Sequence, residues 1–306
     1  MRVSVGLPID RPDTTGQFLT ANGISICAQA VQTAGFHAVF ATDHPAPDAK
    51  WLRAGGHPTL DPFVALSFAA AATDTICLHT NLLVLPYRNP LLAAKSVASL
   101  DVLSNGRVIV GVGVGYLQSE YAALGVNFSD RRALTDDALT VMLTAWKGEP
   151  FDHDGLGYSA RRTVVQPMPK QLPHPPLWIG GNSKRAIERA IAYGNGWSPM
   201  PSPASSASYL GTPGMESIAD FRERMKLFRD LFAASGRTDT LDIAVVPTTL
   251  SGFGQSSWSR GALQDEIGQL ASAGATVLVV NISAKNLGQY TENVAQLGSD
   301  LISLLP

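Results

Sequence analysis

This sequence has little charge, no long basic run and no long apolar run. Charged residues make up 16% of its 306 residues, the formal net charge is −2, and Lys and Arg never occur in runs longer than a pair. Nucleic-acid binding needs a basic patch, so no nucleic-acid partner is expected. No apolar run is long enough to cross a bilayer, and residues 1–8 lack the charged-then-apolar pattern of a signal peptide. We therefore expect no membrane partner and a cytoplasmic protein.

Signatures of common catalytic machinery are also missing. The two cysteines, Cys27 and Cys77, lie in apolar segments and are expected to be small buried residues in a reducing compartment, without a disulfide. The six histidines show neither His-x-His nor His-Glu-x-x-His, and acidic residues do not cluster, so no metal site is expected. No Gly-x-Ser-x-Gly elbow or Walker-type phosphate loop occurs.

The sequence does contain a β-branched run that leads into three glycines at alternate positions, RVIVGVGVGY at residues 107–116. The run predicts a buried parallel strand. Glycines just past the end of a strand would let the backbone approach a flat or anionic group. Their spacing differs from that of the dinucleotide fingerprint, and no acidic residue stands at the ribose position. The pattern therefore argues against an NAD-binding Rossmann fold.

Strand and helix patterns alternate along the whole chain. This alternation predicts a parallel sheet, and no composition shift marks a linker, so residues 1–306 are expected to form a single domain. Eight strand candidates predict an α/β fold, a (β/α)8 TIM barrel with insertion loops at its C-terminal face. A doubly wound open sheet is the alternative. The expected strands are 3–8, 38–42, 76–85, the glycine-rich run, 177–180, 196–199, 241–247 and 276–281.

Two segments interrupt the alternation. Residues 151–176 hold five prolines and a Gly-Leu-Gly turn, and we expect an irregular excursion with a hairpin. Residues 201–213 are rich in Ser, Pro and Gly and are longer than a simple connector. Loops of that length are usually functional or mobile, so the second segment is a candidate part of the site.

In a barrel of this kind the active site lies at the carboxyl ends of the strands. The predicted ends lack the facing carboxylates of a glycoside hydrolase and the lysine that an aldolase would need. A rim with few nucleophiles fits an enzyme whose reactivity comes from a bound organic cofactor. The residues expected at this rim are Asp43, His44, 81–88, 113–116, 180–183, Trp197, Thr248 and Asn281.

Several motifs, in their order and spacing, resemble the bacterial luciferase-like superfamily of flavin- and deazaflavin-dependent oxidoreductases. The resemblance covers residues 2–200, and segments 85–88 and 117–131 are most similar to its F420-dependent branch. The matching motifs are VFATDH at 39–44, TNLLVLPYRNP at 80–90, SNGR at 104–107, PPLWIGGNS at 175–183 and GNGW at 194–197.

The resemblance implies a site for F420, with FMN as the alternative cofactor. It implies a non-proline cis peptide at Asn81-Leu82 behind the cofactor ring, where the local sequence alone predicts an ordinary strand end. The turn at 180–183 would hold the cofactor phosphate, or would simply cap a helix. Arg88 would reach cofactor or substrate anions, or form an ion pair within the rim. The implied cofactor-binding residues are Asp43, Asn81, Leu82, Arg88, Gly113, Val114, Gly115, Gly180, Gly181, Asn182 and Ser183.

His44 is the expected catalytic residue. It follows a strand and precedes a proline, at a place where an imidazole can take or return a substrate proton near neutral pH. The alternative is a histidine hydrogen-bonded between loop backbones. Some sugar-phosphate dehydrogenases of the superfamily carry a glutamate where this chain has Tyr116. That difference argues against a sugar-phosphate substrate and leaves the proton donor open.

The expected function is an F420-dependent oxidoreductase that moves a hydride between the deazaflavin ring and a small organic substrate. The alternatives are an FMN-dependent monooxygenase that uses reduced flavin and O2, and a non-catalytic barrel that stores a flavin.

The resemblance also implies a homodimer, with helices at 61–73 and 90–103 as candidate faces, and a segment at 201–213 that closes over the substrate. Trp51, Trp178, Trp197 and Trp258 would line an apolar pocket or belong to the core.

Overall fold

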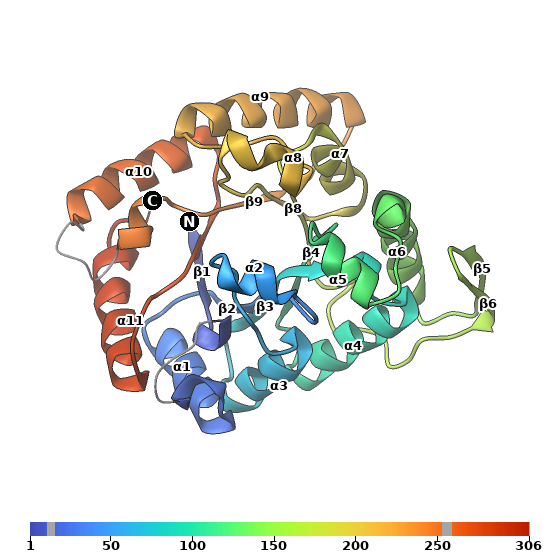
Figure 1. Cartoon of the computed structure of the whole chain (residues 1–306), viewed down its shortest axis with the longest axis horizontal. Coiled ribbons are helices and arrows are strands. Elements are labelled where there is room, and N and C mark those ends of the chain that lie inside the picture. The colour runs from blue at the N-terminus through green and yellow to red at the C-terminus, as the bar shows by residue number, and fades with distance from the viewer. Residues whose placement is uncertain (11–15, 253–258, 306) are drawn as a thin grey trace.

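The eight predicted parallel strands close into a barrel. The computed structural model describes residues 1–10, 16–252 and 259–305. The strand order around the barrel is β1-β10-β9-β8-β7-β4-β3-β2, with helices outside (Figure 1), so the predicted TIM barrel is confirmed and the open sheet was the wrong alternative. The strands are β1 (Arg2–Gly6), β2 (Ala38–Ala41), β3 (Cys77–Val84), β4 (Val108–Gly113), β7 (Leu177–Gly180), β8 (Gly196–Ser198), β9 (Asp242–Val245) and β10 (Val277–Val280).

The outer helices begin at caps that the sequence supplies. Asp61 accepts hydrogen bonds from the backbone N–H groups of Phe63 and Val64, and Pro62 occupies the first turn of α3. Within the described ranges, no helix is both long enough and apolar enough to span a membrane. The main helices are α1 (Ala21–Thr33), α3 (Pro62–Ala72), α4 (Pro90–Leu103), α6 (Arg131–Ala145), α7 (Lys184–Tyr193), α9 (Ile218–Ser235), α10 (Arg260–Ala273) and α11 (Leu287–Ile302).

Large side chains from alternate strand positions fill the barrel interior. The His79 ring lies 4.8 Å from the Trp178 ring and 6.1 Å from the Phe40 ring, measured between centroids. Ala38 and Phe40 of β2 belong to this inner cluster, whereas Val39 packs in the larger cluster between strands and helices. Because side chains alternate along a strand, the next inward position after Phe40 is Thr42, at the mouth of the barrel.

His79 makes the stability of the barrel depend on pH. It is fully buried with Nδ1 3.1 Å from Ser4 Oγ, and burial, aided by the charge of His37, lowers its pKa to about 3. An unfolded histidine takes up a proton near pH ~6.5. As the pH falls below that value, the unfolded state therefore binds a proton that the folded state does not.

We expect this single group to lower the free energy of unfolding by about 1.4 kcal/mol per pH unit, from roughly pH 6.5 down to the folded-state pKa. The His79→Gln variant should lack that contribution and show a flatter slope. Urea titrations of both proteins across this pH range measure the difference. Parallel slopes would show that His79 does not titrate between the two states.

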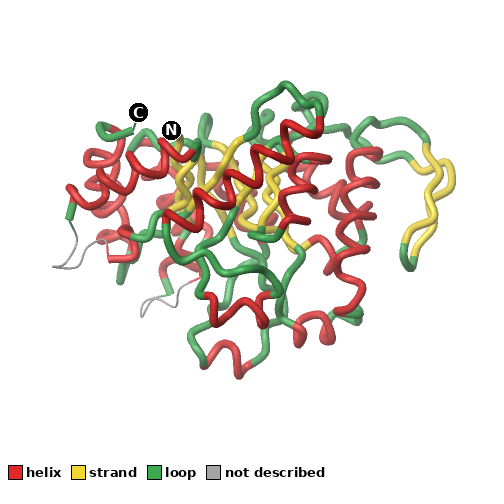
Figure 2. Tube along the Cα trace, turned by 90° about the horizontal axis from the view of Figure 1, so that it is seen from above, coloured by secondary structure: helices red, strands yellow, loops and turns green. Residues whose placement is uncertain are grey.

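The proline-rich excursion forms the expected hairpin. Strands β5 (Phe151–Gly155) and β6 (Tyr158–Thr163) pair antiparallel and project away from the barrel (Figures 1 and 2). The hairpin is tied to α6 because Asp137 lies 2.6 Å from His153 Nε2 and accepts a hydrogen bond of 2.9 Å from the Tyr158 hydroxyl.

Three short helices were not predicted: α2 (Ala49–Arg53), α5 (Gln118–Ala123) and α8 (Ala207–Leu210). In Figure 1, α2 and α5 lie in front of the barrel mouth, and Figure 2 shows loops and short helices gathered on one side of the strands. They have between four and six residues, too few for helical periodicity to show in a sequence. The expected insertion loops at the C-terminal face are therefore present, and partly helical.

Candidate active site at the barrel mouth

A buried carboxylate holds His44 at the mouth. The chain leaves β2 at Ala41, and Nδ1 of His44 lies 3.1 Å from Oε2 of Glu120 in α5. Glu120 is fully buried and also accepts hydrogen bonds of 3.0 Å from the backbone N–H of Ala46 and of 3.0 Å from the Tyr87 hydroxyl. Because three donors converge on it, this buried carboxylate is satisfied by the protein alone.

The Glu120 contact defines which nitrogen of His44 is free. A carboxylate only accepts hydrogen bonds, so with Glu120 in that form the contact pairs with the neutral His44 ring that carries its hydrogen on Nδ1. Nε2 then carries the lone pair. The His44 side chain is 11% exposed, and the hydrogen-bond contact described for its ring is the one made by Nδ1. The arrangement suits a general base or acid.

Aromatic side chains surround the His44 ring. Centroid distances from it are 4.7 Å to Trp51, 5.1 Å to His57 and 6.0 Å to Tyr116. Tyr209 of α8 lies 5.8 Å from Tyr116. Burial, with the nearby Tyr209 and Glu120, raises the pKa of Tyr116 to about 12, so its phenol keeps its proton near neutral pH and can donate a hydrogen bond.

The other predicted tryptophans lie elsewhere. Trp178 in the barrel interior and Trp197 of β8 are fully buried, so both belong to the core, which was the alternative for them. Trp258 lies outside the described residues. Among the four, Trp51 is the one that the described structure places beside His44.

Strand β3 bulges at the mouth, where the Asn81-Leu82 peptide bond is cis, as expected. The Leu82 side chain crosses the glycines of two other strands. A Cβ on Gly180 would lie 2.0 Å from Leu82 Cδ1, and one on Gly113 would lie 3.3 Å from the same atom. These glycines therefore leave room for the bulge, and their predicted contact with a cofactor stays a prediction.

Gly111 has still less room, because its neighbour is backbone. A Cβ at this position would lie 2.2 Å from the carbonyl oxygen of Thr80, which cannot swing aside. We expect Gly111→Ala to lower the free energy of unfolding by about 1–3 kcal/mol, the usual cost of overpacking. The control is Gly268→Ala in α10, where a Cβ meets nothing. Helix propensity predicts that this control gains up to about 1 kcal/mol. A Gly111→Ala variant as stable as the parent in urea would contradict the close approach.

Asp43 and Arg88 form a buried ion pair. Arg88 Nη1 lies 2.5 Å from Asp43 Oδ2 and Nη2 lies 2.8 Å from Oδ1, while Oδ2 also accepts the backbone N–H of Val84 at 2.9 Å. Burial alone would lower the pKa of Arg88, but the hydrogen bonds and charges of Asp43 and Asp61 outweigh it and raise that pKa. The structure thus shows the ion-pair alternative for Arg88, and the pair joins the ends of β2 and β3.

The turn after β7 presents a helix N-terminus. Ser183 caps α7, with Oγ accepting the backbone N–H of Ala186 at 3.2 Å. Gly181 takes φ 112°, which favours glycine. The first backbone N–H groups of a helix have no intrahelical partner and are suited to bind an anion. The structure shows the helix cap that was the alternative for this turn. The same geometry is compatible with phosphate binding, which stays a prediction.

The side chain of Asn182 points away from the turn that contains it. It is fully buried, and its Nδ2 donates to the carbonyl oxygens of Met200 at 2.8 Å and Pro213 at 2.9 Å. Its side chain therefore anchors the segment 201–213, which carries α8 and Tyr209 to the mouth. Closure of this segment over a substrate stays a prediction.

Glu120 is the site residue that sequence reasoning missed. It lies in the unpredicted helix α5, and no spacing to His44, 76 residues earlier, reveals the contact. One signal was available: between Arg107 and Asp130 it is the sole charged residue. A single carboxylate in an apolar stretch needs buried partners.

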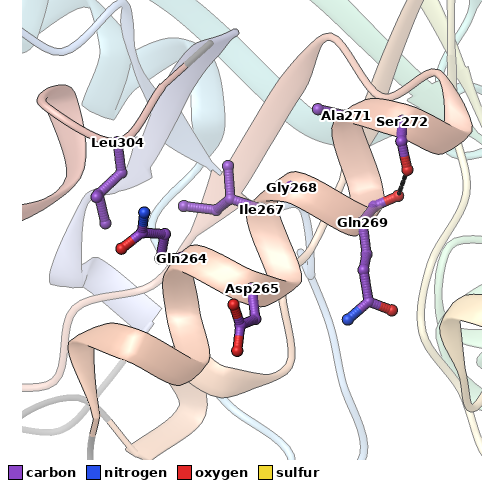
Figure 3. A pocket seen from close by; sticks show the side chains of 8 residues that line it. All are labelled: Gln264, Asp265, Ile267, Gly268, Gln269, Ala271, Ser272 and Leu304. Atoms are coloured by element: carbon purple, nitrogen blue, oxygen red, sulfur yellow. Dashed lines mark hydrogen bonds between the residues drawn. The ribbon is translucent and has the colours of Figure 1, made fainter.

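Away from the mouth, Asp137 brings His153 and Tyr158 together on the hairpin. The described residues contain no group of three or more His, Cys, Asp or Glu that could hold a metal. A surface hollow on α10 (Figure 3) is lined by Gln264, Asp265, Ile267, Gly268, Gln269, Ala271, Ser272 and Leu304. This lining offers one carboxylate and no histidine, aromatic or basic group.

Comparison with known proteins identifies relatives over most of the chain. A sequence profile described as luciferase-like monooxygenase matches residues 1–251. The uncharacterized protein Rv0953c of Mycobacterium tuberculosis is 33% identical over 68% of this chain and 69% of that protein. The F420-dependent hydroxymycolic acid dehydrogenase of the same organism is 28% identical over 68% of this chain and 58% of its own. The FMN-bound oxygenating constituent of 3,6-diketocamphane monooxygenase from a Pseudomonas putida plasmid superposes with TM-score 0.75 at 15% identity, over 100% of this chain and 99% of that one.

Proposed function

We propose that this chain, which belongs to the luciferase-like monooxygenase family, is an F420-dependent oxidoreductase acting on a small organic substrate. A relative with 28% identity is named as an F420-dependent dehydrogenase, which supports this cofactor. The observation that carries the proposal is the His44 ring at the mouth, with Nδ1 3.1 Å from Glu120 and no hydrogen bond described for Nε2 within residues 1–10, 16–252 and 259–305. Oxidation of an alcohol releases a hydride and a proton, and in this proposal Nε2 would take the proton.

The residues at the mouth fit a flat cofactor with a phosphate. Thr42, at the inward position after Phe40, has a buried Oγ1 with no hydrogen-bond partner in the described part of the chain. That hydroxyl can donate to or accept from a bound ring. Gly113 and Gly180 contribute no side chains of their own, and Leu82 packs against both. These observations make the mouth suitable for a ring lying against the β3 bulge.

In this proposal the predicted residues contact different parts of the cofactor. Gly180, Gly181 and Ser183 would hold the phosphate, and the bulge at Asn81 and Leu82 would support the ring. Gly113, Val114 and Gly115 would line the linker, while the Asp43–Arg88 pair would keep His44 and the bulge in place. F420 supplies a ring that accepts or gives a hydride. His44 would hold or return the substrate proton at Nε2.

An FMN-dependent monooxygenase is the alternative, since the FMN-bound structure shares this fold. Anaerobic mixing with F420 and a panel of small alcohols separates the two reactions. Loss of the deazaflavin absorption band with carbonyl product supports the proposal. Oxygen consumption with reduced FMN, and no change of the F420 band, would favour the monooxygenase. Cofactor binding without either reaction would point to a storage protein.

We also propose that two copies associate through α3 and α4. Leu92 is 68% exposed and Leu103 78% exposed on α4, and Val64 and Phe68 are exposed on the adjoining helix α3. Large exposed apolar patches mark interaction sites. Light scattering should give twice the chain mass of 32.4 kDa, and Leu92→Arg should shift the mass towards one copy. Parent protein with the mass of a single chain would contradict this proposal.

A further inference from the structure

We propose that Glu120 is the positioning residue of this site, which keeps the hydrogen of His44 on Nδ1 so that Nε2 can take the substrate proton. The kinetic part of this inference rests on the proposed function, whereas the tautomer does not. The two nitrogens of a neutral imidazole are not equivalent, because one donates and the other accepts. The partner of Nδ1 therefore decides whether the nitrogen that faces the substrate is a base.

The residues before and after Glu120 in the sequence fix its position. Ser119 donates a hydrogen bond of 2.5 Å to Asp48, the cap of α2, and the Tyr121 hydroxyl donates to the carbonyl oxygen of Val114, just past β4. These two contacts tie the short helix α5 to the cap of α2 and to the chain just past β4. A side chain so anchored keeps its geometry without a ligand, which is what positioning requires.

One oxygen of the Glu120 carboxylate faces an obligate donor. Oε2 faces His44 Nδ1 and the Tyr87 hydroxyl, and Oε1 faces the backbone N–H of Ala46. The backbone group cannot reverse its role, so Oε1 is an acceptor. In the proposed alcohol oxidation, bound F420 would supply the hydride acceptor for the substrate carbon, and Nε2 of His44 would take the hydroxyl proton. The imidazolium then keeps Nδ1–H on Glu120, and no proton passes to the carboxylate.

Glu120→Gln tests this assignment sharply, because the amide can fit in one orientation. Its carbonyl oxygen must face the N–H of Ala46, which puts the NH2 group where Oε2 meets His44 and Tyr87. The hydroxyl of Tyr87 can rotate to accept, and Nδ1 of His44 must also accept. The ring hydrogen then moves to Nε2, and the nitrogen facing the substrate is no longer a base.

Nitrogen NMR of histidine-labelled protein, without cofactor, reads the tautomer directly, with the His44 signals assigned from a His44→Gln sample. We expect Nδ1–H in the parent and Nε2–H in Glu120→Gln. Tyr87→Phe is the matched control, since it removes one donor from the same oxygen and should keep Nδ1–H. An Nε2–H tautomer in the parent, or no change in Glu120→Gln, would overturn the inference. The parent spectrum decides even if the variant does not fold.

Kinetics provide the second readout. Glu120→Gln should lower kcat by about 10²–10⁴-fold, the usual worth of general acid–base catalysis, with KM nearly unchanged. Glu223→Gln, on the exposed face of α9, should keep the activity of the parent. A Glu120→Gln variant with the parent kcat would overturn the positioning role. If the parent protein does not reduce F420, the proposed function is wrong. The NMR measurement of the His44 tautomer still tests the positioning role of Glu120, because it needs no cofactor.

Discussion

His44→Ala is expected to lower kcat by about 10²–10⁴-fold, because it removes the nitrogen that takes the substrate proton. Affinity for F420 should change little, since the described contacts of His44 go to Glu120 and neighbouring aromatic rings, not to the turn at Ser183. Steady-state rates measure kcat, and cofactor fluorescence measures the affinity. The separation of the two effects is the signature of a proton-transfer role.

Two further measurements make this result specific. His174→Gln replaces a histidine that contacts Pro175 and Trp146, away from the mouth, and should keep the parent rate. Imidazole added to His44→Ala should restore part of the activity, because it can occupy the space of the missing ring. A His44→Ala enzyme with the parent kcat would show that His44 is the hydrogen-bonded loop histidine that the sequence also allowed.

Arg88→Ala is expected to have the largest effect on stability, a loss of about 3–5 kcal/mol in the free energy of unfolding. The Asp43 side chain is 1% exposed and its two oxygens lie 2.5 and 2.8 Å from the guanidinium. Without Arg88 a buried carboxylate keeps mainly the backbone N–H of Val84 as a donor. Chemical denaturation measures the loss. Activity should fall as well, because His44 follows Asp43 directly.

The exposed pair on the hairpin is the control for this prediction. Arg161 and Asp154 approach to 2.5 Å, yet both side chains are more than half exposed, so Arg161→Ala should leave stability unchanged within error. Combining Asp43→Asn with Arg88→Ala should recover part of the loss, since the uncompensated charge is then gone. An Arg88→Ala variant as stable as Arg161→Ala would refute the structural role of the buried pair.

Much of the fold could be predicted because its signals are local. The seven strands that were given explicit bounds lie within two residues of them, β4 lies inside the glycine-rich run, and the helix expected at 90–103 matches α4 residue for residue. Buried β-branched runs and capping residues such as Asp61 and Ser183 carry this information in the sequence itself. The expected single domain over 1–306 stays a prediction.

The contacts of the site could not be predicted because they join distant segments. His44 and Glu120 are 76 residues apart and Asp43 and Arg88 are 45 apart, so only the closed barrel brings them together. The helix that carries Glu120 has too few residues for helical periodicity to be visible in the sequence. Gly113 and Gly180 were predicted to bind the cofactor, Gly180 as part of the phosphate turn, and the structure adds that Leu82 packs against both glycines.

The most direct test of a deazaflavin at the barrel mouth is a pair of dissociation constants, for F420 and for FMN, measured by fluorescence titration of the same protein. The account predicts that F420 binds more tightly, and that the Leu82→Trp variant, which crowds the layer beside Gly180, weakens that binding. Tighter binding of FMN, or no binding of either cofactor, would contradict it.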